Sequence, residues 1–425
     1  MNGQQNSARL EEQGSMKNRH DVAFHIVLSI CFCHSINDML QSSFAAVYPL
    51  LKSEFQLTFG QIGLVTLTYQ LTASLLQPLV GLFADRRPMP FSLPAGTLFT
   101  FTGLVVLSVA PTYAAVLVGG CILGVGSSVF HPESSRVARM AAGDRPGLAQ
   151  SLFQVGGHVG SALGPACAAV VVLRWGRSGL GFFAVLALVS TAVLGRVGFW
   201  YKHQGLARLA RAASGERASS SARDPRASLT TRRVFASMAV LLVLVFSKFV
   251  YIASLTSYYT FYLMHRFELS LASSQMYLFM FLAALAVGTL AGGPLGDRFG
   301  RKRVIWFSIL GVLPFTLALP HADLLWTGVL SVLIGFVLAS AFPAIVVYGQ
   351  ELIPGRVGMV AGLFFGFSFG AAGAGAAILG EIADRTSIEY VYAICAFLPA
   401  LGLSAALLPD LRRGAIRSPA MSELS

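Results

Sequence analysis

Few residues of this chain are charged: Asp, Glu, Lys and Arg make up 12% of its 425 residues, against about 25% in soluble proteins. This shortage argues against a soluble domain. The net charge of +12 could suggest nucleic acid, but the basic residues form no single patch. They fall in short clusters between apolar segments, as in the cytoplasmic loops of membrane proteins. We therefore expect the lipid bilayer, and no nucleic acid, as a partner.

Cysteine is also scarce, and the five cysteines all lie inside apolar segments. Their spacing gives no disulfide framework, so we expect small apolar packing residues. A cleavable signal peptide is not predicted either. The first apolar run is too long, and no A-x-A site follows it.

Long apolar runs, in contrast, are abundant. A helix needs about 20 apolar residues to cross a hydrocarbon core roughly 30 Å thick. Unbroken runs of this length exclude the ten-residue alternation of a β-barrel. The twelve predicted spans are 22–50, 58–83, 91–110, 114–139, 148–172, 178–200, 234–263, 272–293, 304–320, 324–350, 357–380 and 388–408. The predicted fold class is an all-α membrane protein with twelve transmembrane helices.

Most of the 31 Lys and Arg residues fall in alternate loops. This bias sets the orientation of a membrane protein and predicts that both termini are cytoplasmic. The longest polar stretch is rich in Ser, Ala and Arg and is typical of a flexible linker. The predicted organisation is a tail (1–21), a six-helix bundle (22–200), the cytoplasmic linker (201–233), a second six-helix bundle (234–408) and a tail (409–425).

A short loop recurs at about half the chain length. The stretch GLFADRRPMP occupies 81–90, and GPLGDRFGRKR occupies 293–303. The run around Pro132 also aligns with the run around Pro343 at nearly the same offset. Internal repeats of this kind in membrane transporters indicate two parallel bundles related by an axis along the membrane normal.

The second loop completes the pattern G-x-x-x-D-R-x-G-R-K. In the first loop, Pro88 and Pro90 replace the later glycine and base. On this pattern, and on the runs FHPESSRVARM, GLAQSLFQVGG and SKFVYIASLTSYYTFYLM in the two halves, the chain resembles the major facilitator superfamily. Within that family it is similar to bacterial drug/proton antiporters. The resemblance implies two six-helix bundles related by pseudo-two-fold symmetry.

The resemblance also implies a function. The chain would be a monomeric multidrug efflux transporter of the bacterial inner membrane, exporting small-molecule drugs, including anionic phosphonates, in exchange for protons. Protons would be the coupling ion, and no other cofactor is expected. The alternative is a symporter or facilitator that imports a small anionic metabolite. No nucleophile, phosphate loop or metal cluster in the sequence indicates an enzyme.

The charged residues of the repeated loop are candidates for gating. They are Asp85, Arg86, Asp297, Arg298 and Arg301. An aspartate at a helix end can cap a neighbouring helix or pair with arginine. Such a contact would hold the cytoplasmic side closed and break on opening. Static capping is the alternative.

Ionisable residues inside a membrane span are functional candidates by default. Asp38 and Lys248 lie deep in the first and seventh spans, at near-equivalent places in the repeat. The resemblance implies that both face a central cavity. Asp38 would carry a proton, and His34, one turn earlier, would tune or relay it. Lys248 would attract an anionic substrate, with Tyr251 and Ser254 lining the same polar cavity. A structural ion pair between the halves is the alternative.

The fourth span carries His131, Glu133 and Arg136. Glu133 and Arg136 are three residues apart and share a helix face. A proton on Glu133 would release Arg136 for an anionic substrate, with His131 beside them; alternatively, the pair pins the helix end. The H-x-E pattern lacks the later P-C-x-x-C of zinc deaminases, so no metal site is predicted.

The fifth span contains Gly160, Gly164 and Pro165. Glycines four residues apart permit close helix approach, and proline removes a backbone hydrogen bond. The run resembles the G-x-x-x-G-P motif of drug/proton antiporters, and a plain packing seam is the alternative. The fourth-span arginine of such antiporters is missing, since Gly120 stands in its place.

Overall fold

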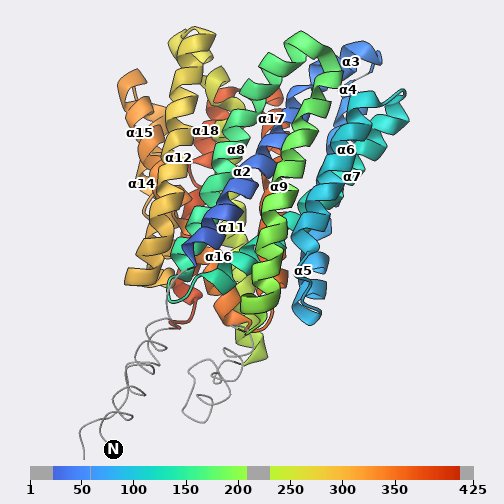
Figure 1. Cartoon of the computed structure of the whole chain (residues 1–425). Helices are drawn as coiled ribbons and strands as arrows, with labels where there is room; N and C mark the ends of the chain where they lie inside the picture. Colours follow the sequence, from blue (N-terminus) through green and yellow to red (C-terminus); the bar gives the residue numbers. More distant parts are fainter. Residues whose placement is uncertain (1–22, 58, 208–229, 412–425) are drawn as a thin grey trace, which may run out of the picture.

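The structure, a computed structural model, describes residues 23–57, 59–207 and 230–411 (Figure 1). The predicted N-terminal tail, and most of the predicted linker and C-terminal tail, lie outside these residues. All regular secondary structure within the described ranges is helical. The predicted all-α class is therefore confirmed.

Helices of the first half follow the predicted spans closely. They are α2 (Phe24–Ala46), α3 (Tyr48–Glu54), α4 (Phe59–Leu75), α5 (Gln77–Arg86), α6 (Ser92–Val109), α7 (Tyr113–Ala141), α8 (Pro146–Trp175), the 3₁₀ turn η1 (Gly176–Gly179), α9 (Leu180–Trp200) and the π-helical turn η2 (Tyr201–Gly205).

The second half repeats this course. Its elements are α11 (Thr231–Phe267), α12 (Leu271–Phe299), α13 (Arg301–Leu310), α14 (Leu313–Ala318), η3 (Leu319–His321), α15 (Leu324–Ala339), α16 (Ala341–Leu352), α17 (Val357–Arg385), α18 (Ile388–Cys395) and η4 (Leu398–Leu407).

Proline accounts for several interruptions within the predicted spans. Pro78 lies in the first turn of α5, and Pro314 lies in the first turn of α14. Proline fits a first turn because its missing N–H would be unpaired there in any case. The second and ninth predicted spans are therefore divided into shorter helices.

Nine helical segments among the described residues are long and apolar enough to cross a membrane. The other three predicted spans, the first, second and fifth, coincide with α2, with α4 and α5, and with α8. The break near Pro78 leaves α4 with 17 residues and α5 with 10. Helices α2 and α8 carry polar residues and glycines where they face each other. The prediction of twelve spans is thus confirmed for nine of them.

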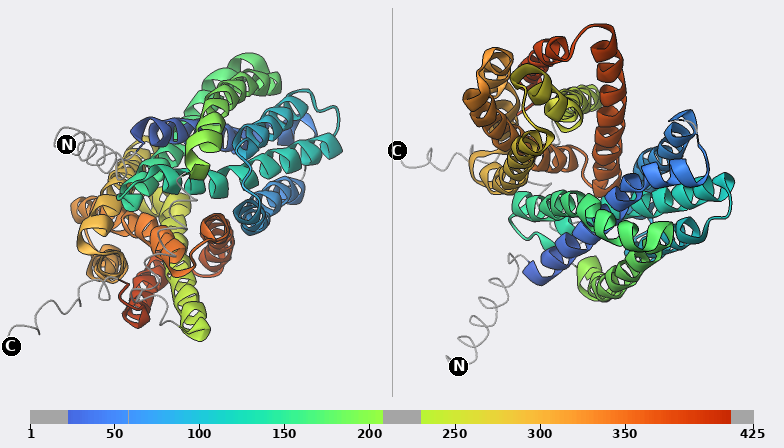
Figure 2. Two further views of the ribbon diagram at one scale, coloured as in Figure 1. Left: turned by 60° about the horizontal axis from the view of Figure 1, so that its bottom comes forward. Right: turned by 90° about the horizontal axis from the view of Figure 1, so that it is seen from above.

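The helices form two bundles. Viewed from above, α2 to α9 lie on one side in blue and green, and α11 to η4 lie on the other in yellow and red (Figure 2). Across the seam, α8 packs against α12, and α17 packs against α5 and α7. The α8–α12 and α17–α5 contacts are related by the internal repeat, because α5 corresponds to α12 and α8 to α17.

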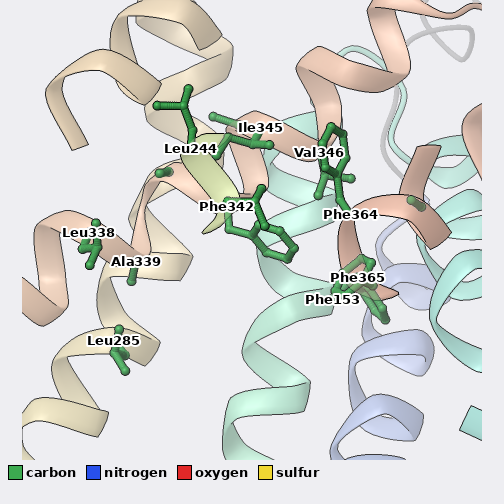
Figure 3. Close-up of a cluster of buried hydrophobic side chains, with 14 of the residues drawn as sticks. Phe153, Leu244, Leu285, Leu338, Ala339, Phe342, Ile345, Val346, Phe364 and Phe365 are labelled. Carbon is green, nitrogen blue, oxygen red and sulfur yellow. The ribbon is translucent and has the colours of Figure 1, made fainter. Parts of the chain in front are cut away.

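Buried aromatic rings join the two halves in the interior (Figure 3). The ring of Phe365 on α17 lies 5.7 Å from that of Phe153 on α8 and 5.2 Å from that of Phe342 on α16, measured between centroids. All three side chains are almost completely buried. Edge-to-face aromatic pairs at this distance stabilise a core beyond the area they bury. The polar residues described next surround this seam.

Candidate functional site

The two repeated aspartates each cap a helix of the opposite half. Asp297 at the end of α12 accepts hydrogen bonds of 3.0 Å from the backbone N–H groups of Gly147 and Leu148, at the start of α8. Asp85 at the end of α5 accepts equivalent bonds of 3.0 and 2.9 Å from Gly358 and Met359, at the start of α17. A carboxylate at a helix N-terminus satisfies free donors and complements the helix dipole.

Glycine permits the close approach that these caps require. A Cβ atom on Gly81 would overlap the backbone of Gly358, and one on Gly293 would overlap the backbone of Gly147. The two pairs are equivalent in the repeat, and in each the partners lie on opposite halves. The two bundles are therefore in direct backbone contact at the end of the molecule that carries Asp85 and Asp297.

The two loops differ in how their basic residues are used. In the second loop, Arg301 pairs with Asp297 at 3.2 Å and with Glu351 at 3.1 Å. Lys302 donates to the backbone carbonyls of Ala406, at 3.1 Å, and of Leu408. These two basic residues therefore brace the second half from within.

In the first loop, the arginine that reaches Asp85 comes from another helix. Arg136 on α7 approaches Asp85 at 3.4 Å and Glu133 at 3.6 Å, and it donates a hydrogen bond to the Tyr201 hydroxyl. Ser92 donates to the other oxygen of Glu133 at 2.8 Å. The predicted Glu133–Arg136 pair is present, and through Arg136 it is connected to Asp85, the cap of α17.

Sequence reasoning missed Ser92 and Tyr201 as partners of this pair. Ser92 begins α6, and Tyr201 begins the turn after α9. Both are far from α7 in the chain, so no local spacing indicates the contact. Arg136 is only 4% exposed and is surrounded by these partners.

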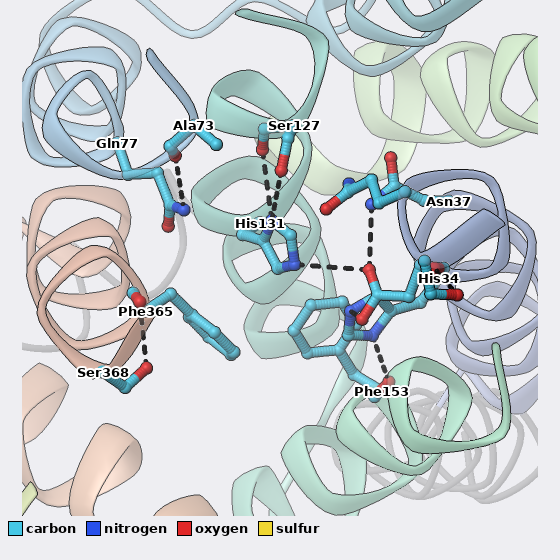
Figure 4. A network of polar contacts seen from close by, with 12 residues as sticks. His34, Asn37, Ala73, Gln77, Ser127, His131, Phe153, Phe365 and Ser368 are labelled. Atoms are coloured by element: carbon cyan, nitrogen blue, oxygen red, sulfur yellow. Dashed lines mark hydrogen bonds and ion pairs between the residues drawn. The ribbon is translucent and has the colours of Figure 1, made fainter. Parts of the chain in front are cut away.

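A second cluster surrounds Asp38. Nε2 of His34 lies 3.4 Å from one Asp38 oxygen, and Nε2 of His131 on α7 lies 3.6 Å from the other. The Nδ1 atoms of His34 and His131 face backbone carbonyls, that of Phe153 at 2.6 Å and that of Ser127 at 3.1 Å (Figure 4). Asn37 donates to Asp38 at 3.0 Å.

This arrangement fixes where protons are held. Because Nδ1 of each histidine faces a carbonyl, it carries a hydrogen, and Nε2 is left to face the carboxylate. Neither Nε2 atom has a hydrogen-bond partner among the described residues, so a proton on either would bind Asp38. The ligand atoms of the three residues lie within 4.8 Å of one another, a spacing that a metal ion could also share. The prediction of no metal site stays untested.

Lys248 lies in the other half, in an aromatic environment. Its ammonium group donates to the Ala339 carbonyl at 3.3 Å and lies 5.1 and 5.0 Å from the ring centroids of Phe249 and Phe342. Cations bind favourably over aromatic faces. Among the described residues, no ion pair joins Lys248 to Asp38. The inter-half ion pair considered as an alternative is therefore not formed in this conformation.

His158 on α8 lies near both charged groups. Its Nε2 is 3.1 Å from the Thr289 hydroxyl on α12, across the seam. The ring is exposed and close enough to interact electrostatically with both Lys248 and Asp38. The sequence did not indicate this role for His158, because nothing in its neighbourhood along the chain points to these partners.

Tyr251 and Ser254 are almost completely buried. Ser254 donates to the Tyr251 carbonyl at 2.7 Å, and its own carbonyl accepts from Tyr392 on α18 at 3.2 Å. Both residues lie in the core of the second half rather than beside Asp38.

The glycines of the fifth span pack α8 against α2. A Cβ atom on Gly160 would overlap the carbonyl of Ser35, and one on Gly164 would overlap the hydroxyl of Ser42. Pro165 lies inside α8. This close packing also positions α8 beside His34 and Asp38, because a Cβ on Gly157 would touch both.

Buried charge in the middle of a membrane bundle is costly and is kept where it handles ions or substrates. The two bundles and their internal charges define a multi-pass membrane transporter. Residues 30–373 and 262–423 match the Major Facilitator Superfamily, and the chain belongs to this family. The family predicted from the loop pattern is therefore confirmed.

Relatives cover nearly the whole chain. The Fosmidomycin resistance protein of Escherichia coli (strain K12) is 56% identical over 394 residues, which are 92% of this chain and 94% of that protein. The uncharacterized MFS-type transporter YfnC of Bacillus subtilis (strain 168) is 38% identical over 91% of this chain and 93% of its own length.

Solved structures share the fold. The transporter FucP in the outward conformation superposes with a TM-score of 0.70 at 15% identity, over 92% of this chain and 99% of that one. The proton:xylose symporter XylE gives a TM-score of 0.71 at 15% identity, over 93% and 99%. The expectation of a transporter rather than an enzyme is confirmed by the family match and by the 56% identical relative.

Proposed function

We propose that this protein exports drugs, fosmidomycin among them, across the bacterial cytoplasmic membrane in exchange for protons, with both termini in the cytoplasm. The observation that carries the proposal is the buried cluster of His34, Asp38 and His131. In it, two imidazole nitrogens that have no hydrogen bond among the described residues face one carboxylate. Such a cluster binds and releases protons in the interior of the membrane. The 56% identity to a fosmidomycin resistance protein supports the choice of substrate.

Asp38 carries the coupling proton, with the two histidines fixing its position. Glu133 carries a second proton. Protonation of Glu133 weakens its ion pair with Arg136, and Arg136 also contacts Asp85. A proton at Glu133 is therefore communicated to the cap that holds α17 against the first half.

Lys248 attracts the anionic group of the substrate. It lies in the opposite half from Asp38, has no carboxylate partner in the described part of the chain, and is only 3% exposed. A phosphonate entering between the halves would supply the missing negative charge. His158 contacts Thr289 across the seam and interacts electrostatically with both groups.

Alternating access follows from the seam. In this conformation the halves touch at the end with Asp85 and Asp297, which the charge distribution predicts to be cytoplasmic. Opening that end requires both caps to break while the bundles rock as rigid bodies. The arginines of the loops, including Arg86 and Arg298, lie beside the caps.

The test uses purified protein in inverted vesicles with an imposed pH gradient. The wild type should take up fosmidomycin when the vesicle interior is acidic, and Asp38→Asn and Glu133→Gln should lose this uptake while remaining folded. Normal uptake by both variants contradicts the proton assignment, and uptake in the direction of proton flow identifies an importer. A chelator arm shows whether a metal ion contributes to transport.

A further inference from the structure

An open apolar groove of about 750 Å³ runs between α5 and α6, beside the first repeated loop. This volume is within the range of ligand sites, which span about 300 to 1,000 Å³. Large side chains line it, among them Leu79, Phe83, Met89, Phe91 and Phe99. Leu79 is 62% exposed and Phe83 is 49% exposed. The groove therefore lies on the outer surface, where α5 and α6 occupy the edge of the bundle (Figure 1).

Two arginines stand at one end of this groove. Arg86 ends α5, and Arg87 follows it directly. Both are exposed, and no hydrogen bond or ion pair joins either one to another residue in the described ranges. Pro88, next in the chain, already belongs to the lining.

The equivalent loop of the second half is built differently. There, Arg301 and Lys302 are engaged with carboxylates and backbone carbonyls, and they begin the helix α13. In the first half, Pro88 and Pro90 occupy the matching region and line the groove. Because of this departure from the repeat, the first loop lacks the two basic residues that make these contacts in the second. It has instead an apolar site beside Arg86 and Arg87, which are unpaired within the described ranges.

We propose that an anionic phospholipid binds here, with one acyl chain in the groove and its phosphate against Arg86 and Arg87. Charge complementarity favours this occupant, because basic residues beside a bilayer attract anionic headgroups, and the lining residues other than Ser92 are apolar. The floor of the groove includes Ser92, which donates to Glu133. The lipid therefore sits one hydrogen bond away from the Glu133–Arg136 pair.

Native mass spectrometry of the full-length protein in mild detergent tests the site, with phosphatidylglycerol and phosphatidylethanolamine titrated separately. The wild type should retain one phosphatidylglycerol at least fivefold more tightly than phosphatidylethanolamine. Arg86→Gln with Arg87→Gln should remove the preference. Ala95→Trp should remove binding without a change of charge, since Ala95 is an exposed lining residue.

The matched control is Arg298→Gln with Arg303→Gln, which removes two exposed charges from the loop of the second half. This control should keep the preferred lipid, and thermal melting shows that each variant is folded. Equal affinity for the two lipids, or equal loss in the control, overturns the proposal. Binding that Ala95→Trp removes but the Arg86/Arg87 variant preserves would mean an uncharged apolar occupant, which also overturns it. Because the readout is lipid binding, the result is independent of the proposed transport activity.

Discussion

Asp85 of the first half binds the backbone of Gly358 in the second, with 3.0 Å between its Oδ1 and the Gly358 nitrogen. Asp297 binds Gly147 in the reverse direction at the same distance. The repeat therefore produces two reciprocal caps, each of which requires both halves. Their surroundings are unequal: the Asp85 side chain is 3% exposed and that of Asp297 is 14% exposed.

Neutralising these caps should impair transport to different degrees. Arg136 is more deeply buried than Arg301, and Asp85→Asn leaves it with one fewer carboxylate partner. After Asp297→Asn, in contrast, Arg301 still pairs with Glu351. Loss of a buried charge partner is costly, so we expect Asp85→Asn to lower the transport rate about tenfold, equivalent to 1.4 kcal/mol. The effect of Asp297→Asn should be smaller. Initial rates in vesicles measure both, and equal, negligible effects would reduce the two loops to topology signals.

A methyl group in the seam should shift the conformational equilibrium. Gly362 and Gly370 lie on the same helix, α17, but a Cβ on Gly362 would overlap the carbonyl of Gln77, whereas a Cβ on Gly370 meets nothing within 4 Å. Gly362→Ala should therefore disfavour the conformation in which the Asp85/Asp297 end is closed. Labelling of a cysteine introduced at that end should become faster.

Gly370→Ala is the control for this comparison. It adds the same atom to the same helix, where alanine is favoured over glycine by about 1 kcal/mol. Its labelling rate should match that of the wild type. Equal labelling of the two variants would show that the seam tolerates the extra atom.

Substitution of either histidine in the Asp38 cluster should impair proton coupling while the protein remains folded. We expect His131→Gln to slow drug-driven proton movement at least tenfold, because the amide cannot take up a proton. His34→Gln should do the same, since its ring faces the other oxygen of Asp38. Proton flux is followed with a pH-sensitive dye during counterflow. Unchanged flux in both variants would show that neither histidine takes part in proton coupling.

Lys248→Met should separate stability from transport. The substitution removes a buried ammonium group that has no carboxylate partner among the described residues, and burying an unpaired charge costs free energy. We expect a higher melting temperature together with at least a tenfold loss of affinity for anionic substrates. Lys248→Arg keeps the charge and should retain partial affinity. A lower melting temperature with unchanged affinity would place Lys248 in a structural role.

Local patterns were enough to predict most of the fold. Apolar run length located the spans because a bilayer imposes a minimum length on every crossing helix, and the recurrence of the Asp–Arg loop revealed the two halves. Predicted boundaries such as 91–110 and 178–200 fall within a few residues of α6 and α9. The proline that follows Leu76 was not interpreted as a helix break, so the division of the second span into α4 and α5 was not predicted.

The candidate site could be predicted only in part. The Glu133–Arg136 pair could be predicted because residues three positions apart on one helix share a face. The partners of Asp38 were not, since His131 reaches it from α7 and the carbonyl that orients His34 comes from α8. Such contacts depend on how helices distant in sequence are packed.

The amino-acid sequence by itself thus determined the class of protein, its division into two bundles and the set of buried charged residues. Only the tertiary structure decided which charges meet: Arg136 with Asp85, Asp38 with two histidines, and Lys248 with aromatic rings rather than with an acid. The physical reason is that helix formation depends on neighbours a few residues apart. Contact between helices depends instead on glycine-lined surfaces that bring segments more than a hundred residues apart together, as Gly147 and Gly293 show.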